Sequence, residues 1–168
     1  VVVKCNNGAV PNYKDNILNV SNVSNNSVCE FYDSLNNSIN ETDGTENNFL
    51  ILKNIQEDKT YSIKSVMNFN LHGNTIYGVF NIQDDTRFFS DIDGAVISHE
   101  FVTDSVTTMS VYYESVVNLD NVTIMSSGSP INLFATSTLN INNSKIYSTN
   151  QNASSGIWCH NGNTTLNV

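Results

Sequence analysis

The segment Asn70-Leu71-His72-Gly73-Asn74-Thr75-Ile76-Tyr77 has related copies further along the chain. Each copy places an aliphatic residue directly after an Asn or Asp, and a second aliphatic residue five positions later. Successive copies are shifted by 21, 27 and 22 residues, and periods of roughly 20–50 residues are typical of solenoids. The four aliphatic pairs are Leu71/Ile76, Ile92/Ile97, Leu119/Ile124 and Ile141/Ile146.

The residues around these pairs favour short strands over helices. An amphipathic helix needs apolar residues at i, i+3, i+4 and i+7, whereas residues 116–119 and 138–141 place apolar side chains at alternate positions. A polar corner follows, at Asp120-Asn121 or Asn142-Asn143, and then a second short strand. Stacked coils would bury both aliphatic side chains in one core while their strands pair in parallel. The sequence therefore predicts an all-β parallel β-helix, a solenoid of roughly four to six coils of about 21–27 residues with the eight aliphatic residues in buried columns.

The repeat does not extend over the whole chain. We expect an irregular N-terminal cap over residues 1–48 and β-helix coils over residues 49–168. Because Leu166-Asn167-Val168 matches only the start of a unit, we expect the coils to be truncated at the C-terminal end. Unpaired strand edges pair with any available strand. We therefore predict a polymeric state, with an assembly edge that further coils of the same chain or a second copy would cover. The edge residues are Val1, Val2, Val3, Leu166 and Val168.

Two segments carry a resemblance to a known family. Gly73-Asn74-Thr75-Ile76-Tyr77-Gly78 resembles the G-N-T-I-x-G turn that often opens the first regular coil of a right-handed parallel β-helix. Residues 155–168 are similar to the G-A-I-x-x-x-x-G-N-L-T-I-x-N coil of cell-surface adhesin-like proteins and polymorphic outer-membrane proteins. The resemblance covers residues 49–168 and implies the right-handed, pectate-lyase-like fold with an adhesin-like role. The same superfamily includes pectate lyases, polygalacturonases and phage tailspikes.

The composition argues against several classes of partner. The formal net charge is −9 and no Lys/Arg cluster is present, so we expect neither nucleic acid nor an anionic membrane surface to bind. No apolar run approaches the roughly 18 residues of a membrane span, so we expect no membrane insertion in this segment. No P-loop, Gly-x-Ser-x-Gly elbow or Cys-x-x-Cys motif occurs, and we expect no cofactor. We expect the protein to be extracellular or at the cell surface.

The three cysteines fit an oxidising compartment. Cys5 and Cys29 flank part of the segment without repeats and are candidates for a disulfide. Such a bond would close a loop of about 25 residues and contribute roughly 3 kcal/mol. Cys159 either pairs with a cysteine of a later coil or is a buried small hydrophobic residue.

The chain contains 29 asparagines. Asn suits corners because it tolerates positive φ and bonds its own backbone, and at equivalent corners of stacked coils it can form amide ladders. An AT-rich genome would raise the asparagine content as well. Nine asparagines begin an Asn-x-Ser/Thr sequon and are candidates for glycosylation in a secreted eukaryotic protein. They are Asn19, Asn22, Asn25, Asn36, Asn40, Asn121, Asn142, Asn152 and Asn163.

One acidic cluster is a candidate for chemistry. Asp84 and Asp85 are adjacent, with Asp91 and Asp93 nearby, and paired carboxylates can act as general acid and base on a glycosidic bond. The runner-up function is therefore a polysaccharide lyase or glycoside hydrolase centred on Asp84, Asp85 and Asp91. The same carboxylates could bind Ca²⁺, and the simplest interpretation is a solvated acidic turn. The histidines lack zinc-like spacing and are expected at the surface without a metal; they are His72, His99 and His160.

A solenoid presents long repetitive faces that bind partners or act as stalks without an active site. Aromatic side chains on such faces could contact a sugar or a protein, although we favour the alternative that half of them pack in the core. The candidates are Tyr112, Tyr113, Tyr147 and Trp158. We predict a non-catalytic, extracellular, adhesin-like or filament-forming structural protein that contacts itself or a host or environmental glycan or protein. A phage or viral fibre shaft, which usually trimerises, is a further alternative.

Overall fold

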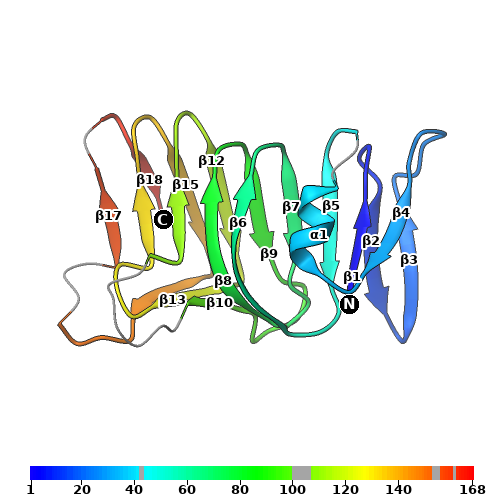
Figure 1. Ribbon diagram of the computed structural model, residues 1–168, viewed down its shortest axis with the longest axis horizontal. Helices are drawn as coiled ribbons and strands as arrows, with labels where there is room; N and C mark the ends of the chain where they lie inside the picture. The colour runs from blue at the N-terminus through cyan, green and yellow to red at the C-terminus, as the bar shows by residue number, and fades with distance from the viewer. Residues whose placement is uncertain (42–43, 100–106, 153–155, 161) are drawn as a thin grey trace.

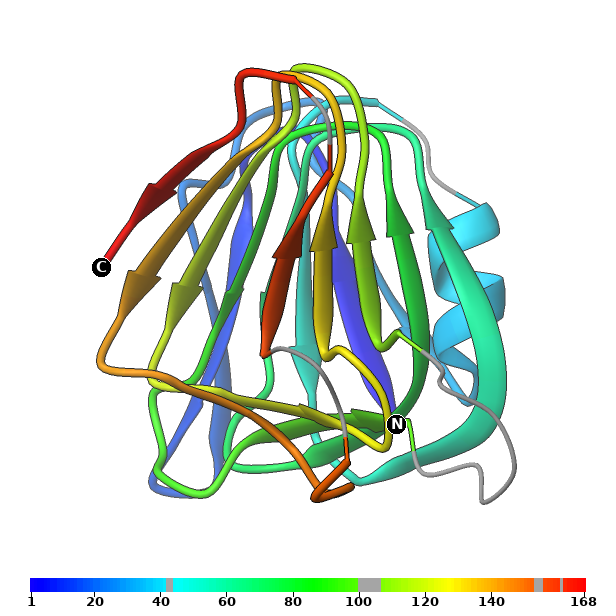
Figure 2. The same ribbon diagram turned by 90° about the vertical axis from the view of Figure 1, so that its left-hand side faces the viewer.

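The computed structural model describes residues 1–41, 44–99, 107–152, 156–160 and 162–168. The protein is nearly all β, with 53% strand and 4% helix. The strands lie side by side along the long axis of the molecule (Figure 1), and a view along that axis shows the chain winding around a common centre (Figure 2). The all-β class and the parallel pairing that the repeat predicts are confirmed.

The strands divide into an N-terminal group and a repeating group. The N-terminal part contains β1 (Val2–Cys5), β2 (Val10–Lys14), β3 (Ile17–Ser21), β4 (Cys29–Tyr32) and the helix α1 (Leu35–Asn40). The repeating part contains β5 (Asn47–Ile51), β6 (Ile55–Ile63), β7 (Met67–Asn70), β8 (Thr75–Ile82), β9 (Thr86–Phe89), β10 (Val96–His99), β11 (Met109–Val111), β12 (Val116–Asp120), β13 (Thr123–Ser126), β14 (Ile131–Leu133), β15 (Thr138–Asn142), β16 (Lys145–Ser148), β17 (Ile157–Cys159) and β18 (Thr165–Asn167).

Parallel pairing joins each repeat to the next. The first sheet has the strand order β18-β15-β12-β9-β7-β5-β1-β4. The second sheet has the order β16-β13-β10-β8-β11-β14-β17, and β6 also pairs with β8. From β5 onward the described pairs are parallel, and each joins strands of neighbouring repeats. The parallel strands nearly close on themselves, as in a barrel.

The long strand β8 pairs with two different strands of the following repeat. Its first part, Thr75–Tyr77, pairs with β10, and its second part, Phe80–Ile82, pairs with β11. In later repeats two separate strands replace this long strand, so that β12, β13 and β14 together form one repeat. The repeat therefore contains three strand segments, one more than the two that the sequence pattern indicates.

Isoleucines form one column of the core. Ile55, Ile76, Ile97, Ile124 and Ile146 are register partners from β6 to β16. The middle three have no exposed surface, and Ile146 is partly buried against the same core. Burying such a side chain contributes about 1.5–3 kcal/mol relative to leaving it in water. The predicted burial is confirmed for the middle three residues.

A second column combines aromatic and aliphatic side chains. Phe49, Phe69, Phe88, Leu119 and Ile141 are register partners in the first sheet. The rings of Phe49 and Phe69 stack with their centroids 4.5 Å apart, and those of Phe69 and Phe88 with their centroids 5.0 Å apart. Leu119 is buried as predicted, and Ile141 is partly buried against this core.

Two of the eight predicted column residues lie elsewhere. Leu71 is buried, but it follows β7, and Phe69 takes the expected place in the column. The prediction for Ile92 is wrong, because its side chain is 47% exposed. The connection from β9 to β10 is longer than that from β12 to β13. Its extra residues form a turn that carries Ile92 outward, away from the core.

Asparagines form the expected ladders, mainly on a strand face. Asn121 and Asn143 lie at equivalent corners with φ of 56° and 45°, a region that Asn tolerates better than most residues. The Nδ2 of Asn143 lies 3.5 Å from the Oδ1 of Asn121. The ladder with the shorter hydrogen bonds lies on β12, β15 and β18. There Asn140 donates to Asn118 at 2.8 Å, and Asn167 donates to Asn140 at 2.7 Å.

The N-terminal segment is more regular than the expected irregular cap. β1 lies antiparallel between β4 and β5, and Val2 and Val3 are buried. Both edges of β1 are therefore paired, and β4 is the strand at this end of the sheet. The helix α1 packs Leu35 and Ile39 against the core.

Side chains hold the first turn of α1. The Oγ of Ser34 accepts a hydrogen bond from the N–H of Asn37 at 3.1 Å. The carboxylate of Glu57 accepts from Leu35 at 2.6 Å and from Asn36 at 3.0 Å. These bonds satisfy N–H groups that lack partners inside a helix, and the two to Glu57 fasten α1 to β6. Within the described ranges, no helix is long and apolar enough to cross a membrane.

Cys5 and Cys29 form a disulfide with an S–S distance of 1.98 Å. The two residues are register partners of β1 and β4, so the bond fastens the outermost strand to the rest of the cap. Cys159 is free and exposed, so the expectation of a buried hydrophobic residue is wrong.

Candidate functional site

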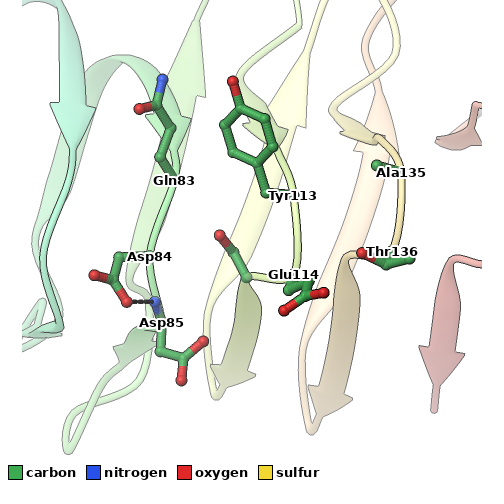
Figure 3. A pocket seen from close by; sticks show the side chains of 8 residues that line it. Gln83, Asp84, Asp85, Tyr113, Glu114, Ala135 and Thr136 are labelled. Carbon is green, nitrogen blue, oxygen red and sulfur yellow. Dashed lines mark hydrogen bonds between the residues drawn. The ribbon is translucent and has the colours of Figure 1, made fainter.

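A hollow of about 500 Å³, termed the corner hollow, opens where the chain passes from the second sheet to the first. Three successive connections form it: β8 to β9, β11 to β12, and β14 to β15 (Figure 3). Neighbouring strands of a sheet lie about 4.8 Å apart, so these connections bring residues that are distant in sequence side by side. The lining residues are Gln83, Asp84, Asp85, Tyr113, Glu114, Ser115, Ala135 and Thr136.

The backbone makes the same turn in two of these connections. Tyr113 and Ala135 occupy equivalent positions with φ of 59° and 53°. In both turns a serine N–H donates to the carbonyl of the aromatic residue three positions earlier, at 3.4 and 3.3 Å. The repeated turn leaves the side chains of Tyr113 and Glu114 exposed at the corner.

Asp84 and Asp85 both lie in the hollow, and both carboxylates bond to backbone. The Oδ1 of Asp84 accepts from the N–H of Asp85 at 2.8 Å (Figure 3). The Oδ1 of Asp85 accepts from the N–H of Val116 at 2.9 Å, which links two repeats. Glu114 is not among the site residues named from the sequence, and its side chain makes no hydrogen bond to another described residue. Its exposed carboxylate is the one best placed to meet a ligand.

A stack of parallel rings, which we term the aromatic row, lies along the same corner. Tyr112, Phe134 and His160 hold equivalent positions, since each N–H donates to a carbonyl of the preceding repeat at 2.9, 2.9 and 2.8 Å. Ring centroids lie 4.8 Å apart for Tyr112 and Phe134, and 4.0 Å apart for Phe134 and His160. Trp158 stacks on His160 with centroids 5.0 Å apart. Gln83 has the equivalent position one repeat before Tyr112.

The aromatic residues named from the sequence lie at the surface. The exposed fraction is 65% for Tyr113, 45% for Tyr147 and 50% for Trp158, and Tyr112 is partly buried within the aromatic row. The expectation that half of these side chains fill the core is therefore wrong. They lie at corners or at outward positions of strands, whereas Phe49, Phe69 and Phe88 take the inward positions in the first sheet.

Asp91 and Asp93 lie at another corner, and β9 separates them from Asp84 and Asp85. The Oδ1 of Asp91 is 2.8 Å from the Nδ1 of His72, beside a second hollow of about 550 Å³. Asp93 accepts a hydrogen bond from a side-chain amide of the next repeat at 3.1 Å. The four aspartates therefore do not form one site. Among the residues that the structure describes, no group of three His, Cys, Asp or Glu is placed to hold a metal ion.

All three histidines are partly buried, which differs from the expected surface positions. His72 contacts Asp91, and His160 is held in the aromatic row. The Nδ1 of His99 lies 3.8 Å from the carboxylate of Asp58. Burial lowers the pKa of His99, and the charge of Asp58 opposes this effect.

The candidate glycosylation sites differ in their exposure and in their hydrogen bonds. Asn121 donates to a backbone carbonyl at 3.0 Å and Asn142 to a carboxylate at 3.1 Å, both in the preceding repeat. Asn36 is partly buried in α1, and the serine of its sequon is buried. The sequons of Asn40 and Asn152 include residues outside the described ranges. The exposed candidates whose sequons lie wholly within the described ranges are Asn19, Asn22, Asn25, Asn142 and Asn163.

The chain matches no protein-family model, and comparisons with curated proteins and with solved structures also gave no match. The resemblance of residues 49–168 to adhesin-like repeats therefore stays a prediction. A functional proposal rests on the repeats and on the surface they form.

Proposed function

We propose that the chain is a right-handed parallel β-helix that serves as a non-catalytic, extracellular, adhesin-like or filament-forming surface protein. The observation that carries the proposal is the recurrence of like side chains at equivalent positions of successive repeats. Three strand segments of one repeat pair in parallel with those of the next, as a solenoid requires. The right-handed winding that we propose follows from the rule that crossover connections between parallel strands are right-handed in about 98% of cases.

The rows of side chains suit adhesion or support better than catalysis. The amide ladder of Asn118, Asn140 and Asn167 lies on one strand face, and the aromatic row follows a corner. Neither row contains a pair of carboxylates. A surface that repeats about every 4.8 Å can contact an extended partner at several points, and multiple contacts raise the overall avidity.

The proposal includes a partner for the strand edges. β16, β17 and β18 are the last strands in their sheet paths over the described residues, and Leu166 is 43% and Val168 95% exposed. Such edges pair with another strand, which further coils of the same chain or a second copy would supply. Val1–Val3 does not contribute to this edge, since β1 is paired on both sides.

A polysaccharide lyase or hydrolase is the second candidate, because Asp84, Asp85 and Glu114 line one hollow. Two observations favour the non-catalytic function over it. The carboxylates of Asp84 and Asp85 accept backbone hydrogen bonds, which gives them a role in the turn. Asp91, the third residue of the expected catalytic set, lies by the second hollow.

The test incubates the chain with neutral and acidic polysaccharides and measures both binding and new reducing or unsaturated chain ends. We expect binding to at least one surface or polymer without any product. Product that disappears in an Asp84→Asn/Asp85→Asn double variant would overturn the proposal in favour of the enzyme. Light scattering provides the second measurement, because a discrete trimer would favour a fibre shaft over end-to-end assembly.

A further inference from the structure

We propose that the corner hollow and the aromatic row bind an uncharged polysaccharide chain laid along the stack of repeats. This inference rests on the non-catalytic function proposed above and names the ligand class of that function. Three features of the site identify the ligand: an exposed ring, polar side chains that make no hydrogen bond to other described residues, and the absence of cationic side chains among the residues that line the hollow.

Tyr113 supplies the exposed ring. Its side chain is 65% exposed, and it rises from the hollow beside the side chain of Gln83 (Figure 3). A tyrosine ring has a large apolar face and a polar tip, and covering that face is favourable. The C–H face of a pyranose covers such a ring while its hydroxyl groups point sideways toward polar neighbours. The ring therefore sets the position of one sugar unit.

The neighbouring polar groups suit the hydroxyl groups of that sugar. The amide of Gln83, the carboxylate of Glu114 and the hydroxyl of Thr136 make no hydrogen bond to other residues that the structure describes. Together they offer both donors and acceptors. They come from three successive repeats, so a ligand that uses all three must lie along the stack.

The charges of the hollow exclude an acidic glycan. Asp84, Asp85 and Glu114 line it without any Lys, Arg or His, and the chain has a net charge of −9. A polyuronate or a sulfated polymer would be repelled by this field. A cationic peptide is less favoured than a neutral glycan, since two of the three carboxylates already accept backbone hydrogen bonds.

The aromatic row determines the length of the ligand. From Gln83, which holds the equivalent position one repeat before the row, to His160, the site covers three steps between repeats, or about 14 Å at the usual strand spacing. The stacked rings cover one another's faces, whereas Trp158 is 50% exposed. Tyr113 and Trp158 are then two separate contacts for one chain, so an oligosaccharide should bind more tightly than a disaccharide.

The experiment is calorimetric titration of the 168-residue chain with cellohexaose, xylohexaose, mannohexaose, the corresponding disaccharides, tetragalacturonate and an oligolysine peptide. We expect at least one neutral hexaose to bind, and tetragalacturonate not to bind. Tyr113→Gly removes the ring and suits the positive φ, and it should weaken binding about tenfold, whereas Tyr113→Phe should stay within about threefold. Trp158→Ala should weaken hexaose binding more than disaccharide binding. Phe31→Ala, which replaces an exposed aromatic residue on β4, is the matched control and should leave affinity unchanged.

Several outcomes would overturn the inference. They are no binding of any neutral hexaose, binding of tetragalacturonate or of an oligolysine peptide in place of the hexaoses, and hexaose binding that persists in both Tyr113→Gly and Trp158→Ala. None of these contradicts a non-catalytic role. Shortened oligosaccharides in the titration mixture would instead contradict the non-catalytic function, and a tenfold loss in Tyr113→Gly would still support the ligand class.

Discussion

Replacing Phe69 by alanine tests how strongly the mixed column holds the repeats together. Phe69 is fully buried, its ring stacks between those of Phe49 and Phe88, and it meets the ring of Phe80 edge-on with centroids 6.0 Å apart. A buried Phe→Ala change costs about 3–5 kcal/mol, and each aromatic pair adds about 0.5–1.5 kcal/mol. Because Phe69 makes three ring contacts, we expect Phe69→Ala to lower the free energy of unfolding by an amount near the upper end of this range, about 4–5 kcal/mol. The free energy of unfolding of a typical domain is only about 5–15 kcal/mol.

The assay is equilibrium unfolding in urea followed by far-ultraviolet circular dichroism. Phe69→Leu, which keeps part of the packing, serves as a second variant that should remain folded. Phe31→Ala removes a ring that is 67% exposed, and it should change the unfolding free energy by less than about 0.5 kcal/mol. Repeat proteins can unfold in steps, so the slope against urea must match the wild type before the values are compared. A loss below about 1.5 kcal/mol for Phe69→Ala would show that the column is not a main source of stability.

Four further predictions concern other parts of the chain. Asn140→Ala removes two amide contacts of the ladder and should lower the unfolding free energy by about 1 kcal/mol in urea titrations. Replacing Cys5 and Cys29 by serine should lower it by about 3 kcal/mol, and a reducing agent should have the same effect on the wild type but none on the double variant. Ala135→Gly relieves a φ of 53° and should raise the melting temperature, corresponding to about 0.5–1 kcal/mol. Burial lowers the pKa of His99, so the contribution of His99 to the unfolding free energy should be fully present above a pH of about 6.5 and should be lost as the pH falls below that value. His99→Gln should remove this pH dependence.

The isoleucine column could be predicted from the sequence because the corner at Asp120-Asn121 is short. Only two residues separate β12 from β13, so the spacing of apolar residues along the chain follows the spacing in space. Phe69 and Phe88 could not be assigned to the second column in this way, because longer turns follow β7 and β9. The antiparallel pairing of β1 could not be predicted from the repeat pattern either. Its partner β5 lies more than 40 residues away along the chain, and no local sequence signal indicates such a pairing.

The candidate site was predictable in part. Asp84 and Asp85 stand out as adjacent acids, and both lie in the hollow. The contributions of Glu114 and Thr136 depend on a third strand segment in each repeat, which the pattern did not indicate. A signal for them does exist: residues 112–115 and 134–137 both read aromatic, two variable residues, then serine, 22 positions apart. That recurrence marks the shared turn that brings the two side chains into the hollow.

The reversed direction of β1 bears on how a molecule of this kind can change in length. Each repeat from β7 to β15 meets mainly the repeat before and the repeat after it, so a duplicated or deleted repeat leaves the remaining contacts intact. β1 and β4 instead meet β5 in antiparallel register and are joined by the disulfide, and no parallel repeat can replace them without a change of direction. Gain and loss of whole repeats is therefore open to evolution on one side of β5 only, while the strands on the other side are inherited as a unit.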